Sequence, residues 1–188
     1  MTEILAGKAV HLPKFDFITG TRTFVREIVP KENDLYLFEG IQAIYPEVMR
    51  LVPAKQRCCI FICPPKRVCF NGEVFDGKDI RLIRRIVRDV RDRGFDAAHT
   101  LRVWQTVREN EGKNIFPYED ATDLHIDSFL AYELPVIKPF LEAALAVVPQ
   151  DAAEYAEAQR LLGKFARSPA LSCHYVPQDS MFREFIGK

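Results

Sequence analysis

One stretch of the chain concentrates arginine in a helical pattern. From Ile80 to Arg93, apolar residues recur on one side of a helix and arginines fall on the other. The apolar side consists of Ile80, Ile83, Ile86, Val87 and Val90, and the arginine side of Arg81, Arg84, Arg85, Arg88 and Arg91. Only Asp89 and Asp92 are near enough in sequence to offset the repulsion among these arginines. A phosphate ligand would relieve it, because the guanidinium fork matches phosphate geometry.

A solvated surface would explain the same arginines. Residues 78–113 hold ten Lys/Arg and six Asp/Glu, whereas residues 114–160 hold two and nine. Acids from the second segment are therefore available to pair with arginines of the first, and charge runs are usually solvated. The pattern alone favours the phosphate site and the solvated face about equally.

Glu39 is a second candidate for phosphate chemistry. It follows the apolar run Leu35–Phe38, which has the pattern of a strand buried on both faces. Ligands of open parallel sheets bind beyond the carboxyl ends of strands, where an acid often helps to hold Mg²⁺. A carboxylate that only accepts backbone hydrogen bonds is the alternative. Together with the arginine helix, Glu39 favours phosphoryl transfer.

Cysteine and histidine give weaker signals. Cys58, Cys59, Cys63 and Cys69 lack the spacing of paired zinc knuckles, and we expect no zinc site. His125 is expected to be a packed or surface residue on a short strand.

The elements around these residues predict an α/β fold. Val10–Phe17 and Arg22–Val29 are rich in β-formers and flank Thr19-Gly20, which predicts an N-terminal hairpin. Leu35–Phe38 and Cys58–Cys63 are predicted to be buried parallel strands, joined by a short helix within Ile41–Val52.

The sequence after Cys63 predicts a further hairpin and two helices. Asn71-Gly72 predicts the turn of a small hairpin within Val68–Phe75. Gly94 is the expected end of the arginine helix, and Ala152–Phe165 is predicted to be a packing helix. We find no repeat or linker, so we expect one domain over residues 1–188.

Composition excludes several classes of protein. The 188 residues carry 26 Lys+Arg and 26 Asp+Glu, so no net field draws the chain to nucleic acid or to an anionic membrane. No apolar run approaches the roughly 18 residues of a membrane span, and the first seven residues lack a signal-peptide pattern. Five cysteines, two of them adjacent, suit a reducing compartment. We therefore expect a cytoplasmic protein.

Several segments resemble the uridine kinase/phosphoribulokinase family of P-loop kinases. The resemblance lies in Asp34–Ile41, Asp79–Asp89, Arg93-Gly94 and the hairpin start Leu12–Phe17. Further segments are similar to bacterial uridine kinase-like nucleoside kinases: Arg108, Asn114–Tyr118, Tyr132–Leu134 and Arg183–Gly187. The resemblance implies a parallel sheet with flanking helices, a hairpin over the nucleoside and an arginine-rich lid helix.

The resemblance also implies a role for each matching residue. Arg85, Arg88 and Arg93 would grip substrate and ATP phosphates as catalytic residues during transfer. Phe15, Phe17 and Arg22 would contact the substrate, which would be a nucleoside or another small phosphate acceptor. Glu39 would lie near Mg²⁺ and bind it through water. ATP and Mg²⁺ are the implied cofactors.

The chain departs from the family in one major respect. The first strand and the G-x-x-x-x-G-K-[ST] loop, whose amides cradle nucleotide phosphates, do not occur in the 188 residues. We expect an incomplete domain, inactive alone, whose partner is the missing P-loop segment. We also expect its open sheet edge to promote self-association into a homo-oligomer.

Three hypotheses remain. The chain is the C-terminal part of a nucleoside kinase, a P-loop-free pseudokinase or module that binds a phosphorylated ligand or partner, or a structural protein with a solvated arginine face.

Overall fold

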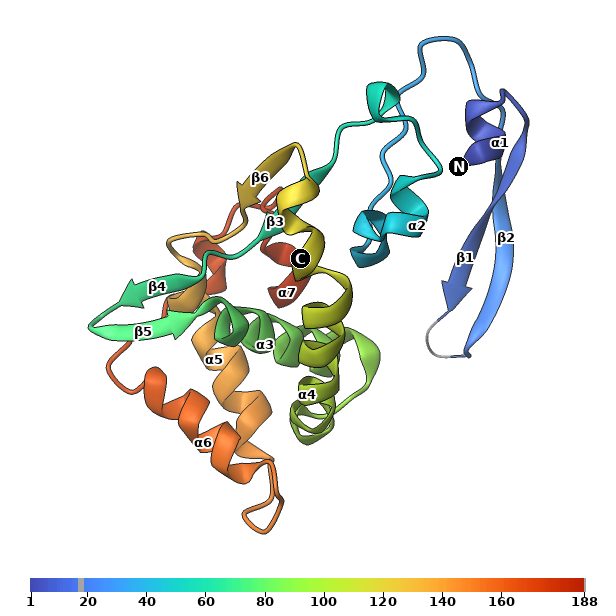
Figure 1. The fold of residues 1–188 in the computed structure, drawn as a ribbon. Helices are drawn as coiled ribbons and strands as arrows, with labels where there is room; N and C mark the ends of the chain where they lie inside the picture. The colour runs from blue at the N-terminus through green and yellow to red at the C-terminus, as the bar shows by residue number, and fades with distance from the viewer. Residues whose placement is uncertain (17–18, 188) are drawn as a thin grey trace. The chain divides into compact units, whose positions relative to one another are not determined.

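The computed structural model describes residues 1–16 and 19–187 and has an α/β architecture (Figure 1). The chain forms two compact units. The first unit contains residues 1–61 and 110–125, and the second contains residues 62–109 and 126–188. Each unit is described by itself below. That residues 1–188 form one domain stays a prediction.

The first unit begins with a short helix and the expected hairpin. Helix α1 spans Thr2–Leu5, and strands β1 (Val10–Asp16) and β2 (Thr21–Ile28) pair antiparallel from Val10↔Ile28 to Asp16↔Thr21. Gly20 lies in the connecting turn with a φ of +67°, a conformation that glycine adopts without steric cost. The predicted hairpin is therefore confirmed over these residues.

The predicted buried strand before Glu39 is wrong. Residues 35–38 form no helix or strand, and Leu35 and Leu37 are 97% and 89% exposed. A strand buried on both faces needs hydrogen-bonded neighbours on both sides. Within residues 1–16 and 19–187, no strand pairs with this segment.

The helix expected within Ile41–Val52 is divided. A 3₁₀ turn, η1 (Ile41–Ile44), is followed by α2 (Pro46–Met49), and η2 (Ala54–Gln56) comes next. Pro46 lacks a backbone N–H and is favoured at the first position of a helix, so the chain starts a new helix there.

Strand β3 (Ile60–Cys63) pairs with β6 (Leu124–Asp127). The Cys59 carbonyl accepts hydrogen bonds from the Asp123 and Leu124 amides, and the Cys63 carbonyl accepts one from Ser128. Partner numbers rise together along both segments, so the pair is parallel. The predicted strand exists, but its predicted burial on both faces is wrong because Ile60 and Ile62 are exposed. Only its alternate residues are partly covered, as in a strand with one packed face.

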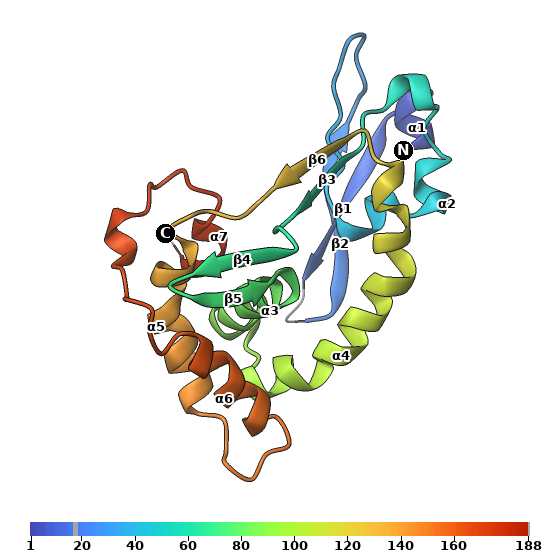
Figure 2. The same ribbon diagram turned by 60° about the vertical axis from the view of Figure 1, so that its left-hand side comes forward.

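The second unit begins with the small hairpin that the sequence predicts. Strands β4 (Arg67–Phe70) and β5 (Glu73–Asp76) pair antiparallel, and Figure 2 shows them leading into α3. Asn71 and Gly72 have φ values of +49° and +81°, so both turn residues are left-handed. That is the backbone of the type I′ turns that Asn-Gly favours.

Helix α3 (Gly77–Arg88) is the centre of the second unit. It continues into a π-helical turn, η3 (Asp89–Arg93), and ends at Gly94, whose φ is +68°. The predicted arginine helix and its glycine end are confirmed. Residues Ile80, Ile83, Ile86 and Val87 are buried as expected, whereas Val90 is exposed because it lies in the π turn beyond the covered length of the helix.

Further helical elements complete the fold. They are α4 (Ala97–Asn114), η4 (Phe116–Ala121), α5 (Glu133–Ala146), α6 (Tyr155–Lys164), η5 (Cys173–Tyr175) and α7 (Arg183–Ile186). The core of the second unit joins side chains of α3, α5 and α6 to the C-terminal segment. Its largest fully buried members are Phe75, Ile80, Leu82, Ile83, Ile86, Leu134, Ile137, Leu141, Leu145, Leu161, Phe165 and Phe182. Residues 1–16 and 19–187 contain no helix long and apolar enough to cross a membrane.

A buried carboxylate ties the start of α3 to α6. Asp79 accepts a hydrogen bond of 2.7 Å from Arg160, and its other oxygen lies 2.8 Å from Lys164 Nζ. Burial alone would raise the pKa of the Asp79 carboxyl, but hydrogen bonds from Arg160 and Lys164 outweigh burial and hold the pKa below its ordinary value.

This pKa predicts a loss of stability in acid. A carboxyl whose folded pKa lies below its unfolded pKa stabilises the fold above the unfolded value, near pH 4. We expect the free energy of unfolding to fall as the pH drops from about 5 through the folded pKa. Urea unfolding across this range measures it, and Asp79→Asn should flatten the dependence. An unchanged pH dependence in Asp79→Asn would contradict the prediction.

Candidate phosphate-binding site

The π turn brings two of the predicted catalytic arginines to one carboxylate. Arg85 Nε lies 3.2 Å from Asp89 Oδ2, and an Arg93 guanidinium nitrogen lies 3.0 Å from Asp89 Oδ1. Asp89 is buried, and the Thr100 hydroxyl donates a third hydrogen bond to it, at 3.1 Å. Arg85 and Arg93 are partly exposed, so one buried carboxylate holds two arginine side chains that lie partly at the surface.

The third predicted catalytic arginine, Arg88, contacts the C-terminal helix. Its guanidinium donates a 3.0 Å hydrogen bond to Glu184 Oε1 and lies 5.9 Å from the ring centre of Phe185. Arg88 Nε is buried and has no hydrogen-bond acceptor among the residues that the structure describes. A buried donor without an acceptor is costly, and a phosphate oxygen is a chemically suitable acceptor.

Arg91 anchors the same C-terminal segment. It donates to the backbone carbonyls of Arg183 and Glu184, and it pairs with Asp92. The hydrogen bond from Arg91 lowers the pKa of the Asp92 carboxyl. Arg91 therefore acts as a support for α7 in this unit.

Arg84 differs from the sequence prediction, which placed it on the ligand-facing or solvated side. It is buried and forms a bidentate pair with Glu133, at 2.5 and 2.6 Å. Ser128 accepts two further hydrogen bonds from it, through its hydroxyl and its carbonyl. The expected pairing with an acid of residues 114–160 holds for this arginine, because the fold packs α5 against α3.

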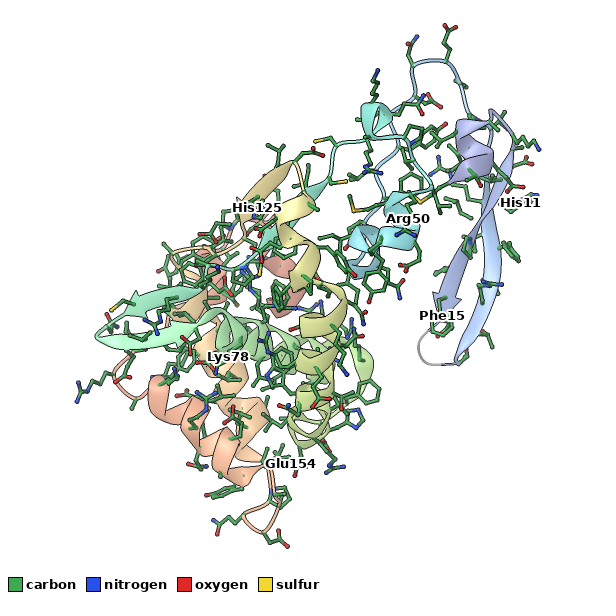
Figure 3. The ribbon with its side chains drawn as sticks, in the orientation of Figure 1. His11, Phe15, Arg50, Lys78, His125 and Glu154 are labelled. Atoms are coloured by element: carbon green, nitrogen blue, oxygen red, sulfur yellow. The ribbon has the colours of Figure 1, made fainter. Side chains whose placement is uncertain are left out.

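Two of the three predicted substrate residues, Phe15 and Arg22, lie on the hairpin of the first unit. Phe15 and Arg22 are cross-strand partners, and Figure 3 shows Phe15 near the end of β1. The Arg22 guanidinium lies 5.7 Å from the ring centre of Phe24, on the same face of β2. This exposed face combines aromatic rings with a cation. Phe17 lies outside the described residues.

Glu39 is exposed, in the irregular segment that precedes η1. No group of three or more His, Cys, Asp or Glu side chains arranged to hold a metal occurs in residues 1–16 and 19–187. Mg²⁺ commonly keeps several waters and takes only one or two carboxylates together with phosphate oxygens. A single exposed carboxylate such as Glu39 would therefore serve only an ion that phosphate oxygens and water also bind.

The structure thus brings Arg85, Arg88 and Arg93 onto one helix end, and Phe15 and Arg22 onto one hairpin face. The predicted sites in the first unit, including Glu39, are not placed relative to the arginines. Sequence reasoning missed Thr100, Glu184 and Phe24 as members of these clusters. Only Phe24 had a usable signal, the two-residue spacing from Arg22 on a predicted strand.

A family model described as the phosphoribulokinase/uridine kinase family matches residues 1–134. The chain belongs to this family. The matched range includes both the hairpin and the arginine cluster of α3 and η3. Family membership thereby confirms the resemblance inferred from the motifs.

Several proteins of the uridine kinase type are similar to the chain. Uridine-cytidine kinase 2-B of Danio rerio is 29% identical over 108 residues, which is 56% of this chain and 34% of that protein. Uridine kinase of Ureaplasma urealyticum serovar 10 is 29% identical over 106 residues, 56% of this chain and 44% of that protein. Uridine kinase-like protein 4 of Arabidopsis thaliana is 32% identical over 102 residues, 54% of this chain and 18% of that protein.

The chain therefore covers less than half the length of each of these relatives. No solved structure matches it at a significant level.

Proposed function

We propose that this chain is the phosphate-gripping part of an ATP-dependent nucleoside kinase, which transfers a phosphoryl group to a nucleoside or a related hydroxyl. The observation that carries the proposal is the arginine cluster of α3 and η3, where Arg85 and Arg93 share Asp89 and Arg88 Nε lacks an acceptor among the described residues. The uridine kinase relatives support the reaction class.

The arginine cluster suits this reaction. Phosphoryl transfer needs positioned positive charge on the migrating group and little covalent chemistry from the protein. Asp89 orients Arg85 and Arg93, whose side chains are partly exposed, and the Phe185 ring supports Arg88. ATP supplies the phosphoryl group and Mg²⁺ neutralises its charge when both are bound. Glu39 would hold that ion through water, and Phe15 and Arg22 would contact the acceptor.

A second candidate is a module that binds phosphate ligands without catalysis. The G-x-x-x-x-G-K-[ST] pattern is absent from the 188 residues. We therefore expect no turnover of ATP and nucleoside by the chain alone. Steady nucleotide formation by the purified chain would contradict this expectation. Both candidates require the arginine cluster to bind phosphate.

Binding of inorganic tripolyphosphate tests the arginine cluster without a contribution from a base or sugar. We expect titration calorimetry to detect binding by the purified chain, and Arg85→Ala and Arg88→Ala each to weaken it roughly 10- to 100-fold. This range corresponds to about 1.4–2.7 kcal/mol, close to the loss of one charged hydrogen bond, which is worth about 1.5–3 kcal/mol.

Arg102→Ala is the matched control, because Arg102 is an exposed arginine of α4 whose side chain pairs with Glu154, at 2.8 Å. Arg102→Ala removes one positive charge from the second unit, as the other two substitutions do, and should leave the affinity for tripolyphosphate nearly unchanged. Equal affinities in the wild type, Arg85→Ala and Arg88→Ala would overturn the proposal and favour a solvated arginine face.

A further inference from the structure

The C-terminal helix α7 supplies an anion to the arginine cluster. Glu184 is the acid that contacts Arg88, one of the three arginines assigned above to phosphate. A carboxylate and a phosphate offer the same chemistry to a guanidinium group, since both present paired oxygens to its fork. Glu184 therefore takes a place on Arg88 that a phosphate oxygen would take.

The contact between Glu184 and Arg88 is weak enough for a competing anion to displace Glu184. Glu184 is 59% exposed and makes a single hydrogen bond with Arg88, so the pair is weak and accessible to a competing anion. Asp89, in contrast, is buried beneath two arginines and a threonine. Of these two acids, only Glu184 can move into water at low cost.

The rest of α7 does not depend on the Glu184 side chain. Phe185 and Ile186 are buried, and Arg91 holds the helix through the carbonyls of Arg183 and Glu184. The Phe185 ring lies 5.1 Å from the Arg84 guanidinium and 5.9 Å from that of Arg88. The carboxylate can therefore leave Arg88 while the ring keeps the guanidinium in place.

We infer that Glu184 is an internal counter-anion of Arg88 that a phosphate ligand displaces, so that Glu184 lowers the affinity of the site for phosphate. This inference rests on the proposed function. It assigns to the C-terminal segment a role in setting that affinity, beyond its packing against α3.

Glu184→Gln tests the inference, because glutamine keeps the size of the side chain and removes its charge. Tripolyphosphate binding to the purified chain is measured by calorimetry at fixed ionic strength. We expect Glu184→Gln to bind about two- to fivefold more tightly than the wild type, as befits the loss of an exposed ion pair. In the Arg88→Ala background the same substitution should give no gain, since the two side chains act as a pair.

Glu142→Gln is the control for net charge. Glu142 is a similarly exposed glutamate, 48% accessible, whose oxygen lies 3.6 Å from Lys138 Nζ on α5. If Glu184→Gln and Glu142→Gln bind alike while Arg85→Ala still weakens binding, the inference fails and the proposed function stands. If neither the wild type nor Glu184→Gln binds tripolyphosphate, both fail. Equal melting temperatures would show that the substitutions leave the fold intact.

Discussion

Replacing Glu133 with glutamine should lower the free energy of unfolding by about 3–5 kcal/mol, the usual cost of breaking a buried ion pair from one side. The side chains of Glu133 and Arg84 are 1% and 8% exposed, and two short hydrogen bonds join them. Glutamine can offer only one acceptor oxygen and no charge. The Arg84 guanidinium would then remain buried, with Ser128 as its chief remaining hydrogen-bond partner.

Urea unfolding followed by circular dichroism measures this effect. Glu142→Gln is again the matched control, since it changes an exposed glutamate of the same helix and should cost less than about 1 kcal/mol. If Glu133→Gln does not fold, the double variant Arg84→Met/Glu133→Met should restore folding, because removing both charges leaves no unpaired charge in the core. A loss below about 1 kcal/mol in Glu133→Gln, or a double variant less stable than the single one, would show that the pair does not hold α3 to α5.

Local patterns in the sequence were sufficient to predict the hairpin of β4 and β5, the arginine helix and α6 of the second unit, but not α4, α5 or α7. The arginine helix combines a strong 3.6-residue period with a terminal glycine, and Asn71-Gly72 specifies a tight turn. Both signals act over a few residues and need no distant partner. The N-terminal hairpin was predictable for the same reason.

The strands were less predictable because a strand depends on neighbours that sequence does not identify. Leu35–Phe38 and Cys58–Cys63 look alike as apolar runs, yet only the second contains a strand, and it pairs with β6 about 60 residues later. An apolar run without a partner has no reason to become extended and buried.

The arginines of the candidate site could be predicted from the sequence, but the acids that they contact could not. The helical period of Ile80–Arg93 placed Arg85, Arg88 and Arg93 in one predicted helix, and the resemblance implied a phosphate role for them. That Arg84 is buried against Glu133 follows only from the packing of α5 on α3. The pairing of Arg88 with Glu184 joins residues 96 positions apart, and no local pattern encodes it.

Asp89→Asn should lower the free energy of unfolding by about 1–3 kcal/mol, a smaller loss than that expected for Glu133→Gln. Asp89 is buried and accepts hydrogen bonds from Arg85, Arg93 and Thr100. The expected loss is smaller than for Glu133 because Arg85 and Arg93 are partly exposed and water can replace part of what they lose. Tripolyphosphate binding should weaken as well, since the two guanidinium groups lose the anion that orients them.

Asp92→Asn separates this positioning role from a simple effect of charge. Asp92 lies in the same π turn and pairs with Arg91, but it is exposed, so its loss should cost less than about 1 kcal/mol. Both substitutions remove one negative charge from the arginine cluster, and electrostatics alone would strengthen tripolyphosphate binding in both. If Asp89→Asn binds tripolyphosphate more weakly than the wild type while Asp92→Asn binds it equally or more tightly, then Asp89 orients Arg85 and Arg93. Tighter binding in both would mean that Asp89 only neutralises charge, and that the arginines reach phosphate without its support.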